Sequence, residues 1–200
     1  MLFVILVIVA FAVGGETPGT DDSTREIVSY YVNNDTEQII AAGLLAWASV
    51  ALLFFLGSLR QTLRRATGDD GGLSAVVMLG GVFIAVGATV FAGLTFALGD
   101  AADDMPVDAI VALNTLNSDM FATLAVGVAT FNLALGLATL RHRVFPKALG
   151  ILAIVVGIAG LTPLGFFAFL VTGLVIVWAS VLLAMRAGSV APPPAMPSSL

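Results

Sequence analysis

The sequence contains no cysteine and very few charged residues. Of its 200 residues, 10% are Asp, Glu, Lys or Arg, and there is one histidine. The lack of cysteine excludes disulfide bonds, thiolate metal sites and cysteine nucleophiles. A soluble domain usually carries about 25% charged residues, so this chain cannot cover itself with a polar surface. With 59% hydrophobic residues and a mean hydropathy of +1.06, most of the chain is expected to face lipid.

Long uncharged runs are the main feature that is present. A membrane-spanning helix needs about 20 apolar residues. Four uncharged runs reach that length, and two shorter candidates accompany them: the long runs are 39–59, 73–98, 120–140 and 164–185, and the short candidates are 1–13 and 146–162. The sequence therefore predicts an all-α, polytopic transmembrane helix bundle of about six spans, in a single domain over residues 1–186.

The short candidates need separate arguments. Residues 148–185 are uncharged throughout and would form one helix about 57 Å long, too long for a single crossing of a bilayer core about 30 Å thick. Residues 162–165 (Thr-Pro-Leu-Gly) supply a break, which predicts a tight helical hairpin, and Pro146 suits the first turn of its first helix. Residues 1–13 predict a tilted first span or one without its true start. Five spans remain if this segment is cleaved or not inserted.

The basic residues predict how the bundle is oriented. In a six-span arrangement, seven of the eight fall on one side: Arg60, Arg64, Arg65, Arg141, Arg143, Lys147 and Arg186. The positive-inside rule places this side, and both termini, in the cytoplasm, with the bundle in the cell membrane. We expect these side chains to contact the headgroups of membrane lipids and to anchor the topology. The Pro- and Ser-rich segment 187–200 is predicted to be a disordered cytoplasmic tail.

The first acidic loop carries the signal of a short helix. Ser23 and Glu26 match the two ends of a capping box, in which each side chain bonds to the other residue's backbone. The helix that follows includes Tyr30 and Tyr31, whose amphipathic rings are expected in the headgroup zone.

Two more caps are predicted on the acidic side. Asn34 and Glu37 would cap the start of the next span, and Asp104 would cap a helix that begins near Pro106. That second helix is expected to run towards the span at 120–140.

Candidate functional chemistry is sparse. Apart from Lys147 at the start of the run at 146–162, no ionisable residue lies inside a predicted span, although such residues are the usual marker of a transport path. Asn132 is the one Asn, Gln or charged residue well inside a span, and it is predicted to bond across helices alongside Thr130 or Thr95, or to contact a ligand. The spacings match no metal site, phosphate loop or catalytic triad. We therefore predict a non-enzymatic protein without cofactor or metal. Because the membrane boundary accounts for the basic residues, no nucleic-acid partner is expected.

Three stretches of the chain resemble a known family. They are "IVSYYVNNDTEQII" at 27–40, "FLGSLRQTLRR" at 55–65 and "GGLSAVVMLGG" at 71–81. Together they resemble small multi-helix integral membrane proteins of actinobacteria and are similar to the uncharacterised DUF4386-like group. The resemblance covers about residues 24–186. It implies a helical membrane architecture with a longer N-terminal helix than this chain has, and it implies no catalytic or binding residues.

Two functions follow as alternatives. The first is a non-enzymatic scaffold or accessory component that contacts other membrane proteins. The second is a binder or transporter of a small apolar or lipidic compound, held in a cavity between the third, fourth and sixth spans and lined by Thr and Asn132.

Overall fold

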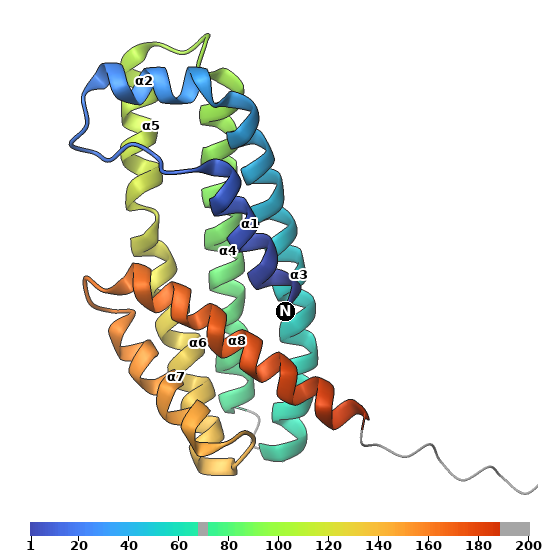
Figure 1. Ribbon diagram of the computed structural model, residues 1–200. Helices are drawn as coiled ribbons and strands as arrows, with labels where there is room; N and C mark the ends of the chain where they lie inside the picture. The colour runs from blue at the N-terminus through green and yellow to red at the C-terminus, as the bar shows by residue number, and fades with distance from the viewer. Residues whose placement is uncertain (68–71, 189–200) are drawn as a thin grey trace, which may run out of the picture.

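The computed structural model describes residues 1–67 and 72–188, which form an elongated, all-helical bundle (Figure 1). The helices of this part of the chain are α1 (Leu2–Gly14), α2 (Thr24–Asn33), α3 (Asp35–Thr67), α4 (Gly72–Ala101), α5 (Val107–Asp119), α6 (Phe121–His142), α7 (Lys147–Ala159) and α8 (Gly165–Gly188). The predicted tail lies outside the described residues from residue 189 onward, and its first two residues belong to α8.

Within residues 1–67 and 72–188, four stretches are long and apolar enough to cross a membrane. They are Asp35–Ala66, Gly72–Ala101, Val107–His142 and Gly165–Met185. The predicted count of about six spans is not confirmed, because α1 and α7 have only 13 residues each. Each is therefore about 20 Å long, shorter than a bilayer core of about 30 Å. The break predicted at residues 162–165 is confirmed, since α7 ends at Ala159 and α8 begins at Gly165.

Helix α4 lies in the interior of the bundle, between α3 and α6, and α7 packs on the other side of α6 (Figure 1). Glycines allow the helices to approach closely. A Cβ atom on Gly80 would lie 2.8 Å from the Cα atom of Phe131, and one on Gly136 would lie 2.8 Å from the carbonyl oxygen of Gly150. Leu, Ile, Val and Phe side chains around these contacts form the main core.

The acidic end of the bundle has a small core of its own. Helix α2 lies across this end and packs against α5 and the end of α4 (Figure 1). Their shared cluster is formed by Ile27, Tyr31, Leu98, Ala102 and Ile110. The capping box is confirmed: Ser23 Oγ accepts from the Glu26 N–H at 3.3 Å, and the Ser23 N–H donates to Glu26 Oε2 at 3.1 Å. This box also holds the pKa of the Glu26 carboxyl below its usual range, first through the Ser23 side chain.

The expected position of Tyr31 in the headgroup zone is wrong. Tyr31 is fully buried rather than turned towards headgroups, and Tyr30 is half-buried. The Tyr31 hydroxyl donates to Asn114 Oδ1 at 2.7 Å, and the Tyr30 hydroxyl donates to the carbonyl oxygen of Gly14. Helix α5 supplies a buried acceptor, so the phenol can leave water without losing its hydrogen bond.

The other two predicted caps are also wrong. Asn34 Nδ2 donates to the carbonyl oxygen of Tyr30 at 2.7 Å, so this side chain closes the end of α2 instead of opening α3. Helix α5 begins after Pro106 with no side-chain cap, and Asp104 takes no part. Pro146 likewise lies at the N-cap of α7, one residue ahead of the first turn.

Candidate functional site

A cavity of about 230 Å³ lies where the small acidic-end core meets the main bundle. It is bounded by five helices that are far apart in the sequence: α1, α3, α4, α5 and α8. Its apolar lining comes from Ala10, Phe11, Ala41, Leu45, Phe91 and Phe166. Its polar lining comes from Glu16, Thr17, Gln38, Thr95, Asn117 and Ser118, with Gly14 and Gly15 at the end of α1.

The end of α1 is tied into this wall by one carbonyl group. The Gly14 oxygen accepts from the Tyr30 hydroxyl and from Gln38 Nε2, the latter at 2.8 Å. Gln38 Nε2 also donates to the Tyr30 hydroxyl oxygen at 3.0 Å. Gly15 then leaves the helix with φ 68°, a left-handed conformation that glycine adopts without steric cost. These bonds fix α1 to α2 and α3 at the rim of the cavity.

Helix α5 presents two asparagines on one face, because Asn114 and Asn117 are three residues apart. Both polar atoms of the Asn114 side chain have hydrogen-bond partners. Its Oδ1 accepts from the Tyr31 hydroxyl, and its Nδ2 lies 3.3 Å from the Pro18 oxygen. Burial raises the pKa of the Tyr31 phenol, and the nearby Tyr30 adds to the shift while the Asn117 side chain opposes it. Tyr31 therefore stays neutral and remains a hydrogen-bond donor.

Two residues that line the cavity each carry a buried polar atom that has no partner among the described residues. They are Thr95 Oγ1 and Asn117 Oδ1, on side chains that are 5% and 3% exposed. Several other Ser and Thr hydroxyls in the bundle bond to the carbonyl four residues earlier, as Ser49 does at 3.1 Å and Thr172 at 2.7 Å. Thr139 Oγ1 and Asn132 Oδ1 are also without a partner among the described residues, but they do not line the cavity. A buried polar atom without a hydrogen bond costs about 1–3 kcal/mol. Both residues thus bring an unsatisfied hydrogen-bonding atom to the wall of the cavity.

The predicted trio of Asn132, Thr130 and Thr95 does not form one site. Asn132 Nδ2 donates to Thr172 Oγ1 of α8 and to the Val128 oxygen, both at 2.8 Å. The interhelical bond therefore exists, but with Thr172 as its partner. Thr130 is half-buried on α6.

Thr95 belongs to a different level of the bundle. Gly80 of α4 lies against Phe131, next to Asn132, and Thr95 lies about 22 Å further along the same helix. The cavity described above lies beside Thr95, and Asn132 is not among the residues that line it. Asn117, which sequence reasoning missed, takes the second polar position there.

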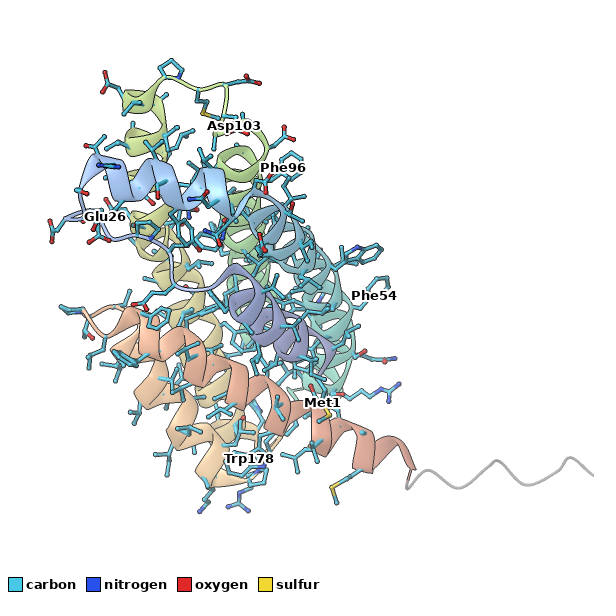
Figure 2. All side chains as sticks on the ribbon, turned by 45° about the horizontal axis from the view of Figure 1, so that its top comes forward. Met1, Glu26, Phe54, Phe96, Asp103 and Trp178 are labelled. Atoms are coloured by element: carbon cyan, nitrogen blue, oxygen red, sulfur yellow. The ribbon has the colours of Figure 1, made fainter. Side chains whose placement is uncertain are left out.

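The predicted lipid anchors gather at the end of the bundle opposite to the cavity's acidic surroundings. Arg60, Arg64 and Arg65 are exposed near the end of α3, and Arg141, Arg143 and Lys147 are exposed around the α6–α7 connection. The side chain of Arg186 lies outside the described part of the chain. Figure 2 shows Glu26 and Asp103 at the other end, beside α2. The two ends therefore differ in charge, as the sequence predicts.

Other candidate groups remain separate. His142 is half-buried at the end of α6. Within residues 1–67 and 72–188, no group of three His, Asp or Glu side chains is placed to hold a metal ion.

Comparisons with family models, with curated proteins and with solved structures find no match for this chain.

Proposed function

We propose that this protein is a non-enzymatic, multi-pass protein of the cell membrane that binds a small, mainly apolar molecule with a polar end. The observation that carries the proposal is the pair of unpartnered atoms, Thr95 Oγ1 and Asn117 Oδ1, on residues of a cavity whose lining combines apolar and polar side chains. Ligand pockets commonly combine an apolar wall with a few polar groups that orient the ligand. A bound polar group would remove the cost of leaving both atoms without a hydrogen bond.

The charge distribution supports an orientation for this proposal. The exposed basic residues around the ends of α3 and α6 face the cytoplasm, following the positive-inside rule. The cavity then lies towards the external side, close to the acidic end. Membrane lipids contact the apolar sides of the bundle, where Phe54 is 78% exposed and points away from the other helices (Figure 2). A role as a scaffold for other membrane proteins stays a prediction that no feature of the cavity supports.

The test is a comparison of ligand-induced stabilisation in purified protein held in lipid nanodiscs. We expect short amphiphiles such as hexanol and hexanediol to raise the melting temperature of the unmodified protein, because a ligand that binds only the folded state stabilises it. Thr95→Val should abolish this shift while leaving the ligand-free protein equally or more stable, because the unpartnered hydroxyl is gone.

Thr89→Val is the matched control. Thr89 lies on the same helix, but its hydroxyl donates to the Ala85 oxygen at 2.8 Å and it does not line the cavity. This variant should keep the ligand-induced shift. If Thr95→Val and Asn117→Leu respond to the amphiphiles as the unmodified protein does, the proposed binding site is wrong.

A further inference from the structure

An apolar groove of about 270 Å³ runs between α1 and α8. Helix α1 contributes Val4 and Ile8 to its lining, and α8 contributes Leu170 and Leu174. The two helices contact each other, and both pass near the middle of the bundle in Figure 1. None of the residues that line the groove is charged. Its walls are therefore suited to a hydrocarbon chain.

The groove and the cavity share the same two helices, in adjoining turns. On α1, Ile8 lines the groove and Phe11 lines the cavity; on α8, Leu170 lines the groove and Phe166 lines the cavity. Positions three or four apart lie on one face of a helix, one turn from each other. Along α1, the distance from Phe11 in the cavity to Val4 at the far end of the groove is about 10 Å.

Neither space is large enough by itself for an ordinary ligand. The cavity has about 230 Å³ and the groove about 270 Å³, so the two together offer about 500 Å³. Small-molecule sites usually measure about 300–1,000 Å³. The combined space is polar at one end only, where Thr95 and Asn117 have unpartnered atoms.

The charges around the polar end restrict the head of the ligand. Glu16 lines the cavity, and neither the cavity nor the groove has a Lys, Arg or His in its lining. A carboxylate or phosphate would therefore meet no cation and one like charge. Asn117 Oδ1 can only accept a hydrogen bond, so the head must donate one, as a hydroxyl group does.

We infer that the ligand is an uncharged, single-chain amphiphile with a hydroxyl-bearing head, of the monoacylglycerol or long-chain alcohol class. Its head binds Asn117 and Thr95, and its chain lies in the groove between α1 and α8. This inference rests on the proposed function, because it extends the cavity by the groove beside it.

Gly173 offers a way to block the groove alone. A Cβ atom there would lie 3.6 Å from Val4 Cγ1, an ordinary contact, so a leucine would project into the groove rather than into packed backbone. Gly57→Leu is the matched control, because this helical glycine has nothing within 4 Å of its Cβ position. Affinities for monolauroylglycerol, laurate and hexanediol are measured in nanodiscs for the unmodified protein, both glycine variants and Thr95→Val.

We expect the unmodified protein to bind monolauroylglycerol at least about tenfold more tightly than hexanediol, because the chain buries additional methylene groups. Gly173→Leu should remove most of that advantage and leave hexanediol binding unchanged, whereas Gly57→Leu should change neither. Thr95→Val should weaken both ligands. Laurate at alkaline pH should bind more weakly than monolauroylglycerol.

A measurement that needs no substitution in the groove covers the case in which Gly173→Leu fails to fold. Trp178 lies one turn beyond Leu174 on α8, whereas Trp47 is 68% exposed on α3. Each tryptophan is observed alone, Trp178 in a Trp47→Phe variant and Trp47 in a Trp178→Phe variant. Stoichiometric monolauroylglycerol with a brominated chain end should quench the fluorescence of Trp178 more than that of Trp47. Equal quenching would indicate partition into bulk lipid and would overturn the inference.

The outcomes separate the two proposals. If Thr95→Val weakens both ligands but Gly173→Leu binds monolauroylglycerol normally, the groove assignment is wrong and the cavity remains a binding site. If laurate binds as tightly as monolauroylglycerol, the assignment of an uncharged head is wrong. If Thr95→Val changes nothing, both proposals fail together.

Discussion

Tyr31 joins two helices of the acidic end through one buried hydroxyl group. Burial raises the pKa of this phenol above its usual value of 10.0, and the adjacent Tyr30 adds to the shift. The folded protein therefore keeps the proton to a higher pH than the unfolded chain does. The stability that this difference contributes is present below about pH 10 and is lost as the pH rises further.

We predict that Tyr31 does not ionise at its ordinary pH while the protein is folded. The chain has only two tyrosines, so Tyr30→Phe leaves Tyr31 as the single reporter in a tyrosinate difference spectrum. The tyrosinate band should appear well above pH 10 in the folded protein and near pH 10 in a denaturing detergent. Ionisation at the same pH in both conditions would show that the phenol is not buried against Asn114.

Asn132 and Thr172 form a polar pair within the apolar core between α6 and α8. Asn132 Nδ2 keeps a second acceptor, the Val128 oxygen on its own helix, if Thr172 is replaced. We therefore predict that Thr172→Val destabilises the protein by about 0.6–2 kcal/mol, the range of interhelical hydrogen bonds in membranes. A double-mutant cycle with Asn132→Leu, measured by unfolding in mixed micelles, should give a coupling energy of the same size. A coupling energy near zero would mean that the bond contributes no stability.

Two glycines of α4 are expected to affect stability in opposite directions, because one packs against a neighbouring helix and the other does not. Gly80 faces the backbone of α6 at Phe131, whereas Gly93 has nothing within 4 Å of its Cβ position. We predict that Gly80→Ala destabilises the bundle by about 1–3 kcal/mol, because the added methyl group forces α4 and α6 apart. Gly93→Ala should stabilise it by about 0.5–1 kcal/mol through helix propensity. Thermal unfolding of both variants tests this, and effects of the same sign would contradict the close approach.

Hydropathy is sufficient to predict the long helices, because an uncharged run of about 20 residues has few alternatives to a helix in lipid. It does not predict how deep a shorter helix reaches. Residues 146–162 are apolar enough to be a span, yet α7 ends at Ala159 after 13 residues, and α1 is as short as the apolar run at 1–13. The break before α8 could be predicted because Pro163 and Gly165 act locally.

The candidate site was harder to predict, because its walls come from five helices that meet only in the folded chain. The sequence identifies Thr95 as a polar residue inside an uncharged run, but its role depends on Asn117. Asn117 lies just before the run at 120–140, where an asparagine looks like an ordinary loop or cap residue. No local pattern distinguishes Asn114, which is satisfied by Tyr31, from Asn117, whose Oδ1 has no partner.

At the scale of the whole molecule, the α7–α8 hairpin reaches only part of the way along α6. Gly160, at the end of α7, lies beside Val128, which is about 13 Å of helix below Asp119. The turn is apolar and exposed: Leu161 is 64% and Leu164 is 57% accessible. Figure 1 shows this turn partway along the bundle rather than at the acidic end.

The backbone N–H groups of this turn also have hydrogen-bond partners. The N–H groups of Leu161, Thr162 and Gly165 donate to backbone oxygens, and that of Leu164 donates to Thr162 Oγ1. Pro163 has no N–H group to satisfy. Irregular backbone at membrane depth is tolerated where it is buried in protein or lines a water-filled cavity, and the paired N–H groups lower the cost of this exposed turn. The hairpin is therefore expected to enter from the basic side and to turn below the external surface.

This topology can be tested with single-cysteine variants, because the chain has no cysteine of its own. We predict that Thr162→Cys in intact cells resists a membrane-impermeant maleimide but reacts with a lipid-soluble one. Asp103→Cys, at the acidic end, should react with the impermeant reagent from outside, whereas Arg143→Cys should react only after the membrane is opened. Reaction of Thr162→Cys at the same rate as Asp103→Cys would instead show that α7 and α8 cross the membrane completely. Such a result would also place the α1–α8 groove closer to the external surface than its position along the bundle indicates.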